Sequence, residues 1–562
     1  MTIMLPKRTR LLMKKFLRDW IFTPKLRQAF HDFSHGKRGM KQYWFHEPID
    51  VGLHNLPIFK NNNQRAWWLS LNYECRPSIL VKNKTRLKIN VEGKPLKSIQ
   101  LGFGVKECDD ISQVEVYING VMQGSVKNLF KESWCDLRIP LDSANEEIDL
   151  EIKCSGRGRL FLSYPYLCTA ENVKPNAQTI VCIVLDGLSQ KFFAAIEKTA
   201  PRYIQNYFRD GVQYTQAFSQ SDWTLPSFSS ILTGLYPHRH GVNNSRQYAT
   251  SIPDNISTLP EILRENGYRT FGYSSHRRFN PAYGHAKGFD RFIYRLRSKD
   301  DYYIQIINEA ILHLEAHAGE KNFVFIHFFD THAPYTPSSY IKNLMMRENR
   351  VYDSSEIFSL TSSKESYDNM VDEARAKLFE VDLALNALFS YLEDHPQLKD
   401  SAVILTCDHG VHPKVKGKML LSELRLHVPL MIKGCGIKAG TNASFVESVD
   451  IMPTILEIAG LKPINDIDGR NLPCLGGSPR ESVFSESLFG NAYNAVIRDE
   501  NFATYLSAPY DERTGRVDLT QVEPIKIFRR KNLFDQVGDE MKANEKQLET
   551  AMNKFLSCFN GK

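Results

Sequence analysis

Five short segments of the chain carry side chains that can bind metals, attack an electrophile or transfer protons. The first is Asp186-Gly187, directly after the apolar run at residues 180–185. A carboxylate at that place can hold a divalent cation, and the glycine lets the backbone turn close to it. Because a strand followed by Asp-Gly is also a common turn, this segment indicates a metal site only in combination with others.

The second segment is WTLPSFSSILTGLYPHRHGV at residues 223–242, in which Thr224 stands where a helix is expected to begin. Unpaired backbone amides and the helix dipole at such a place favour both an alkoxide and an incoming anion. Thr224 is therefore the candidate nucleophile. A simple capping role for this threonine explains the first residues of the segment but not the LTGLYPHRHGV run behind it.

Three further segments follow later in the chain. His332 belongs to FFDTHAPY, and a histidine leaving a strand suits anion binding or proton donation to a leaving group. Asp408 and His409, in TCDHG, offer one oxygen and one nitrogen ligand, which suits zinc or manganese better than calcium. The fifth segment contains Gly417, Lys418, Glu423 and His427. Any one of these segments alone is more often structural than catalytic.

The elements expected to position these side chains are strands of an α/β sheet. From residue 179 onward, short apolar runs alternate with helical stretches, which is the pattern of a doubly wound, mostly parallel sheet. The runs at 180–185, 323–329 and 402–406 are predominantly apolar and are predicted to be continuous buried strands, and each is followed by polar residues. Catalytic groups in open α/β sheets lie at the carboxyl ends of the strands, so we expect these segments to converge there.

A different pattern precedes this region. Residues 80–168 alternate apolar and polar side chains with period two, and Asn119-Gly120 is a tight-turn signal. We expect an antiparallel β-sandwich similar to the jelly-roll modules of enzymes that act on carbohydrates, with a purely structural sandwich as an equal alternative. The expected divisions are a leader at 1–45, the sandwich at 46–172, the catalytic α/β unit at 173–482 and its C-terminal subdomain, with short strands and a terminal helix, at 483–562.

The composition excludes few classes of protein. The 562 residues are 42% apolar and 24% charged, which is ordinary for a folded chain of two or three domains. A net charge of +7 gives no reason to expect a nucleic acid partner. The ten cysteines are scattered without CxxC pairs, which favours reduced thiols and a cytoplasmic location.

The first 40 residues are strongly basic, with Leu12, Phe16 and Trp20 at helical spacing. Residues 7–22 are predicted to form an amphipathic helix that either lies on an anionic membrane surface or packs on the domain behind it. Charged residues interrupt this segment, so it does not contain the uninterrupted apolar stretch of a signal peptide. No other stretch approaches the roughly 20 apolar residues of a membrane span, so the expected location is the cytoplasm, peripherally at the inner membrane surface.

In this order, the five segments resemble the sulfatase and phosphotransferase families of the alkaline phosphatase superfamily. The resemblance runs from about residue 179 to 472, through VDIMPT at 449–454 and DGRNL at 468–472. It continues weakly in NLFD at 532–535, which is similar to the C-terminal LYDL segment of sulfatases. It implies an alkaline-phosphatase-like α/β fold behind the predicted sandwich.

The chain departs from sulfatases where their nucleophile lies. They oxidise a Cys or Ser to formylglycine within C/S-x-P-S-R, and the matching residues here are TLPSF at 224–228. Oxidation of a threonine gives a ketone rather than an aldehyde, and the supporting arginine is Phe228. The Lys-x-His expected after GYRT becomes Ser275-His276-Arg277. These changes indicate a rebuilt sulfate pocket.

The remaining set is similar to threonine-dependent phosphotransferases that modify cell-envelope polymers. The resemblance implies one divalent metal held by Asp186, Thr224, Asp408 and His409. Zinc or manganese is expected first, with calcium and magnesium as alternatives. Thr224 would form a phosphothreonine intermediate and His332 would protonate the leaving group. Lys418 and His427 would hold the non-bridging oxygens, and Asp330 is a candidate ligand of a second metal.

The predicted function is a metal-dependent phosphoryl-type transferase or phosphoester hydrolase. Its expected partners are a phospho-donor and a glycan acceptor, either a surface polysaccharide or a lipid-linked glycan. Two alternatives stay open. The first is a sulfuric ester hydrolase that works without formylglycine, and the second is a catalytically degenerate scaffold that binds glycans.

Overall fold

The computed structural model describes most of the chain between residues 57 and 556. The predicted leader helix at 7–22, Lys418 and the NLFD segment at 532–535 lie outside the described residues. The described ranges are 57–64, 66–91, 96–141, 147–169, 175–196, 203–242, 251–295, 302–332, 364–410, 421–488, 492–511, 516–518, 521–529, 540–541, 553 and 555–556.

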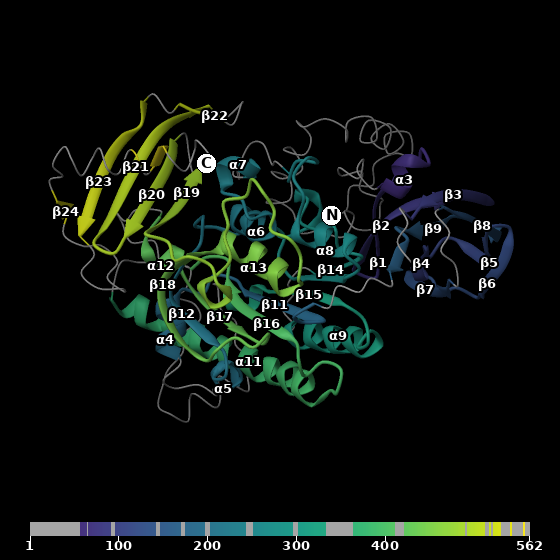
Figure 1. Ribbon diagram of the computed structural model, residues 1–562, viewed down its shortest axis with the longest axis horizontal. Coiled ribbons are helices and arrows are strands. Elements are labelled where there is room, and N and C mark those ends of the chain that lie inside the picture. The colour runs from purple at the N-terminus through teal and green to yellow at the C-terminus, as the bar shows by residue number, and fades with distance from the viewer. Residues whose placement is uncertain are drawn as a thin grey trace, which may run out of the picture.

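A 14-stranded mixed sheet runs through the molecule (Figure 1). Its centre is a parallel block in the order β14-β13-β15-β11-β16. On the far side of β16 the sheet continues through the antiparallel β17 to β12 and β18. The predicted doubly wound, mostly parallel sheet is thereby confirmed. The strand bounds are β11 Thr179–Leu185, β12 Val212–Phe218, β13 Arg269–Ser274, β14 Arg291–Tyr294, β15 Asn322–Phe328, β16 Ala402–Cys407, β17 His427–Lys433 and β18 Gly440–Glu447.

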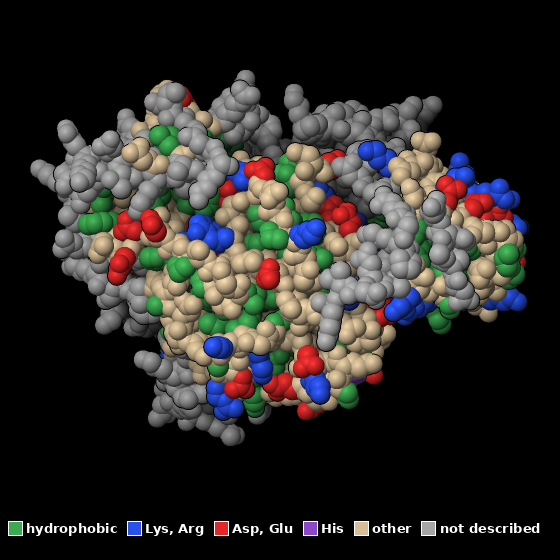
Figure 2. All heavy atoms as spheres, in the orientation of Figure 1, with side chains coloured by type: hydrophobic (Ala, Val, Ile, Leu, Met, Phe, Trp, Pro, Cys, Tyr) green, Lys and Arg blue, Asp and Glu red, His purple; other side chains and the backbone are tan. Residues whose placement is uncertain are grey.

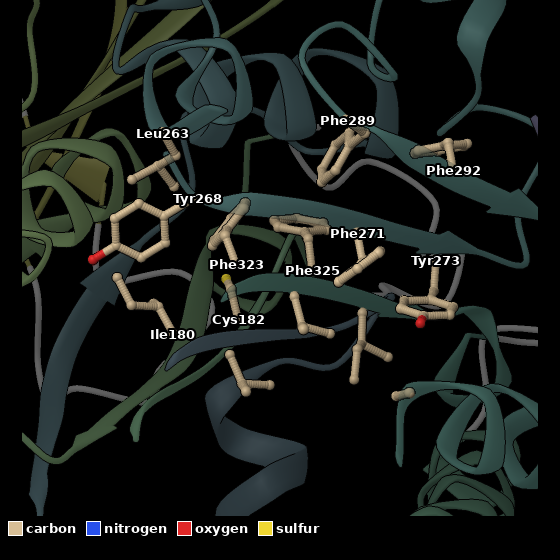
Figure 3. Close-up of a cluster of buried hydrophobic side chains, with 14 of the residues drawn as sticks. Ile180, Cys182, Leu263, Tyr268, Phe271, Tyr273, Phe289, Phe292, Phe323 and Phe325 are labelled. Carbon is tan, nitrogen blue, oxygen red and sulfur yellow. The ribbon is translucent and has the colours of Figure 1, made fainter. Parts of the chain in front are cut away.

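Helices cover both faces of this block, which is why its strands are apolar on both sides. Figure 3 shows the resulting core, in which Phe271, Phe323 and Phe325 lie beside Tyr268 and Tyr273. One group of helices lies below the sheet in Figure 1 and another above it. The first group is α4 (Gln190–Ile196), α5 (Tyr203–Phe208), α9 (Tyr302–Ala316) and α11 (Lys364–Asp394), and the second is α6 (Thr224–Thr233), α8 (Leu259–Glu265) and α13 (Ile451–Ile458).

The register of the parallel strands brings their carboxyl ends to one edge. Leu185, the last residue of β11, pairs with Phe328 of β15 and with Cys407 of β16. The residues that follow these three positions therefore start from the same level of the sheet. This alignment brings Asp186, residues 328–332 and the TCDHG segment together, as expected from the sequence.

The N-terminal part is antiparallel, as predicted, and it continues the central sheet. β2 pairs with β14 through Cys75 with Phe292 and Glu74 with Ile293. A second sheet, in the order β3-β8-β5-β6, shares the apolar core with the first. On the face drawn in Figure 2, acidic and basic side chains are interspersed over this end of the molecule. The bounds are α3 Pro57–Asn61, β1 Trp67–Leu71, β2 Glu74–Val81, β3 Lys84–Asn90, β4 Leu96–Val105, β5 Asp110–Ile118, β6 Val121–Lys127, β7 Ser133–Pro140, β8 Glu147–Arg157, β9 Leu160–Ser163 and β10 Tyr166–Thr169.

The predicted tight turn joins β5 to β6. Asn119 and Gly120 have φ angles of 51° and 80°, so both lie in the left-handed region that favours asparagine and glycine. The period-two alternation of the flanking strands places Val114, Val116 and Ile118 in the core. Local turn chemistry and strand pattern therefore agree in this hairpin.

A separate antiparallel sheet follows the catalytic region. β19 (Ser482–Leu488), β20 (Ala492–Asp499), β21 (Phe502–Asp511), β23 (Glu523–Arg529) and β24 (Glu540–Met541) lie in that order, with β22 (Arg516–Val517) beside β21. It contacts the segment before α6, because Ser485 Oγ donates to the carbonyl of Ser219 at 2.6 Å. The predicted short strands are present, and most of the predicted terminal helix lies outside the described residues. No helix in the described ranges is long and apolar enough to cross a membrane.

Candidate active site

Thr224 is the first residue of α6, as expected from the sequence, and is 2% exposed. The turn before it is fixed by hydroxyl contacts. Ser227 Oγ donates to the carbonyl of Trp223 at 2.9 Å, and Ser219 Oγ donates to Ser227 Oγ at 3.1 Å. These small polar residues hold the threonine hydroxyl at the helix N-terminus inside the molecule.

Asp186 follows β11 and is fully buried. Its N–H donates to the carbonyl of Phe328 at 2.9 Å, and its carbonyl accepts from Thr331 Oγ1 at 2.8 Å. Gly187 has a φ of 71°, a left-handed conformation that favours glycine. Its N–H donates to Asp408 Oδ1 at 3.2 Å, so the tight Asp-Gly turn also orients the second carboxylate.

His409 has a defined tautomer. Its Nδ1–H donates to the carbonyl of Gly410 at 2.8 Å, which leaves the lone pair on Nε2. That nitrogen lies 3.3 Å from Thr224 Oγ1, 3.5 Å from Asp408 Oδ2 and 3.6 Å from Asp186 Oδ1. Four predicted metal-binding residues thus meet around one point.

Two buried carboxylate oxygens face this point without a hydrogen-bond partner among the described residues: Asp186 Oδ1 and Asp408 Oδ2. Burial raises the pKa of Asp186 to about 6. Burial, and then the charge of Asp186, raises the pKa of Asp408 well above its ordinary value. Two uncompensated carboxylates in a buried site are costly, and a cation between them removes that cost.

The donor atoms fit a divalent metal. Asp186, His332 and His409 each offer one ligand atom, and these atoms lie within 4.8 Å of one another. His332 Nε2 is 4.0 Å from Asp186 Oδ1, and its side chain is 27% exposed. Mixed nitrogen and oxygen donors are typical of zinc or manganese sites. The exposure of His332 leaves that side of the site open to a substrate.

Two other predicted residues make different contacts. His427 Nε2–H donates to the carbonyl of Thr215 at 2.8 Å, and its ring stacks on Phe218. The pairing of β12 with β17 causes this placement, so the ring nitrogen that was expected to hold substrate oxygens bonds to the backbone. Asp330 Oδ1 lies 3.9 Å from Lys377 Nζ on α11, and within the described part of the chain it joins no second cluster of metal ligands.

Two histidines that were not predicted to act in the site contact Asp186. His327 Nε2 lies 3.0 Å from Asp186 Oδ2, and His276 Nδ1 lies 3.4 Å from the same oxygen. His327 interrupts an otherwise apolar run at 323–329, and that interruption was the available signal. His276 replaces part of the sulfatase Lys-x-His pattern.

Arginines add positive charge around the threonine. Arg278 lies over the ring of Trp223, with 4.9 Å between the guanidinium carbon and the ring centroid, and Arg425 Nη1 lies 3.1 Å from Asp222 Oδ2. Burial lowers the pKa of His409 well below its ordinary value, and the charges of His332, Arg425 and Arg278 lower it further. Arginine charges of this kind offset part of the negative charge of the nearby carboxylates.

The fold and this cluster of possible metal ligands define an α/β protein of the alkaline-phosphatase-like fold. Among solved structures, the phosphonate monoester hydrolase of Agrobacterium radiobacter aligns with a TM-score of 0.53 at 18% identity, covering 69% of this chain and 96% of that one. Similarity at that level of identity establishes the fold alone.

The chain belongs to the sulfatase family, whose model matches residues 178–461, just over half of its length. A putative extracellular sulfatase Sulf-1 homolog of Caenorhabditis elegans is 24% identical over 363 residues, which are 56% of this chain and 51% of that protein. The N-acetylglucosamine-6-sulfatase of Capra hircus is 27% identical over 337 residues, or 50% and 60% of the two chains. This chain therefore spans only about half to three-fifths of these relatives.

These relatives overturn the predicted chemistry. They are named as sulfatases, so a phosphoryl-type transferase or phosphoester hydrolase acting through phosphothreonine is the wrong prediction. It followed from the threonine at position 224 and from metal ligands that the superfamily shares. Such ligands stabilise an anionic ester whether its central atom is phosphorus or sulfur, so residue types alone did not separate the two reactions.

Proposed function

We propose that this chain is a metal-dependent sulfuric ester hydrolase that uses Thr224 itself as the nucleophile, without formylglycine. The observation that carries the proposal is the sulfatase match at 178–461, which includes Asp186, Thr224, Asp408 and His409. The geometry supports it, because Thr224 Oγ1 lies 3.3 Å from the lone-pair nitrogen of His409 at the centre of the cluster.

When bound, a divalent metal would be held by Asp186, Asp408 and His409, and would lower the pKa of the Thr224 hydroxyl and offset negative charge on the ester oxygens. Zinc or manganese is proposed, because His409 contributes a nitrogen ligand whose tautomer is fixed by Gly410. The metal content of purified protein tests this assignment separately from turnover.

In the first step, the alkoxide of Thr224 attacks the sulfur, and the bond between sulfur and the leaving oxygen breaks. His332, which is 27% exposed, donates its proton to that oxygen. In the second step His332 takes a proton from water, the resulting hydroxide attacks the sulfur, and the bond to Thr224 breaks. Hydrogen sulfate leaves, and the threonine alkoxide and protonated His332 are restored.

The proposed substrate class is a sulfated carbohydrate. Its support is the similarity to a relative named as an N-acetylglucosamine-6-sulfatase. Arg278 and Arg425 place positive charge beside the nucleophile, where the anionic ester would bind. A sulfated amino sugar is therefore the first substrate to test.

The test measures sulfate release from N-acetylglucosamine 6-sulfate by ion chromatography, with metal-free protein reloaded with zinc or manganese. Wild type and Thr224→Ser should release sulfate, whereas the isosteric Thr224→Val should lose at least about 1,000-fold in kcat. If Thr224→Val binds as much metal as wild type, its loss of activity is due to the missing hydroxyl and not to a damaged metal site. Full activity in Thr224→Val would contradict a threonine nucleophile, and metal-loaded protein that releases no sulfate from any sulfated sugar would contradict the hydrolase.

A further inference from the structure

The two oxygens of Asp186 face different groups of histidines. Oδ1 faces His409 and His332 in the metal-ligand cluster and has no hydrogen-bond partner among the described residues. Oδ2 lies 3.0 Å from His327 Nε2 on the opposite side. One oxygen is therefore available to a cation, while the other is held by a neighbouring strand.

His327 acts as the donor in this contact. An ionised carboxylate can only accept, so Nε2 carries the hydrogen and Nδ1 carries the lone pair. His327 is fully buried. Among the described residues, Nδ1 of His327 has no hydrogen-bond partner. The contact of Nε2 with Asp186 is therefore the one hydrogen bond that the imidazole makes with them.

Aromatic rings fix the orientation of this imidazole. Phe228 and Phe279 meet it edge to face, at centroid distances of 4.6 Å and 5.5 Å, and they stack on each other at 4.3 Å. Phe228 stands where the sulfatase motif has an arginine. An arginine there would place a charge against His327, whereas phenylalanine gives an apolar wall on that side of the ring.

We propose that His327 is a positioning residue that holds Asp186 Oδ2, so that Oδ1 points at the bound metal, and that Phe228 keeps the imidazole in this orientation. His327 reaches Asp186 because β11 and β15 are neighbouring parallel strands in which His327 pairs with Val184. It touches neither the substrate nor the metal. The proposal concerns the metal site and is independent of which ester the enzyme hydrolyses.

The experiment measures zinc affinity by competition with a chromophoric chelator, using full-length protein stripped of metal. His327→Phe fits the aromatic surroundings but cannot donate, and it should weaken zinc binding about 10- to 100-fold, as loss of an outer-sphere contact typically does. His327→Gln retains an amide N–H and should recover most of the affinity. The matched control is His285→Phe, since His285 is an equally buried histidine that contacts Ser229 instead of Asp186, and its zinc affinity should equal that of wild type.

Unchanged zinc affinity in His327→Phe would overturn the proposal. So would a fall from two bound zinc ions to one, because His327 would then be a ligand of a second metal. If His327→Phe does not yield folded protein, His327→Asn replaces it, since its shorter amide stops short of Asp186. It must then bind zinc more weakly than His327→Gln, and equal affinities would contradict a positioning role.

Discussion

At the scale of single residues, the residue types predicted the cluster of possible metal ligands. They did not predict the histidine that contacts Asp186 from the neighbouring strand. Asp186, Asp408 and His409 stand directly after apolar runs, so strand ends could be recognised and aligned. His327 lies inside such a run, and its approach to Asp186 depends on the register between β11 and β15. Asp330 is a different case, because its motif suggested a ligand of a second metal, while in the structure α11 brings Lys377 Nζ to 3.9 Å from its carboxylate.

Arg278 gives a test of anion binding beside Thr224. Replacing it with methionine keeps the length of the side chain but removes the charge. We expect kcat/KM for a sulfated sugar to fall about 10- to 100-fold, mainly through KM, because a charge-assisted contact contributes roughly 1.5–3 kcal/mol. Steady-state kinetics measure the effect. Arg86→Met, on the distant β3, is the control, and an equal loss in both variants would show a nonspecific charge effect.

At the scale of elements, strands were more predictable than the contacts between them. Period-two alternation and Asn119-Gly120 predicted the N-terminal hairpins, because local chemistry determines both. The pairing of β2 with β14 joins residues more than 200 positions apart. No local pattern records that pairing, so the sequence predicted the antiparallel N-terminal strands but not that one of their two sheets continues into the central sheet.

Charged side chains that are buried or half-buried at this joint stabilise it. Burial alone raises the pKa of Glu74, but the charges of Arg291 and Arg76 outweigh it and lower the pKa to about 2. Glu74→Gln leaves the buried Arg76 and the half-buried Arg291 without this carboxylate, so we expect the free energy of unfolding to fall by about 3 kcal/mol. Urea unfolding measures it. Glu147→Gln, which breaks the exposed pair with Lys88, should change it by less than about 1 kcal/mol, and similar losses in both variants would contradict the importance of burial.

At the scale of the whole molecule, stability should depend on pH through histidines buried as neutral groups. Burial lowers the pKa of both His240 and His285 to about 3, and their rings contact Ser230 and Ser229 of α6. The unfolded chain binds protons at these residues near pH 6.5, whereas the folded chain does not until about pH 3. The stabilisation is therefore complete above about pH 6.5 and is lost as the pH falls towards 3.

Denaturant unfolding between pH 7 and pH 4 checks this dependence. Each of the two histidines should contribute about 1.4 kcal/mol per pH unit within that window. His285→Gln removes one titrating group, so its stability should fall less steeply with decreasing pH than that of wild type. Identical slopes for the two proteins would show that His285 is not buried as a neutral group.

The proposed function requires that the site hydrolyses sulfate esters with an unmodified Thr224 as its nucleophile. The most direct measurement compares kcat/KM for 4-nitrophenyl sulfate and bis(4-nitrophenyl) phosphate, which share a leaving group, in metal-loaded wild type and Thr224→Val. A sulfatase with a threonine nucleophile should prefer the sulfate ester, and its sulfate turnover should be lost in the variant. Preference for the phosphodiester, or sulfate turnover that survives in Thr224→Val, would contradict it.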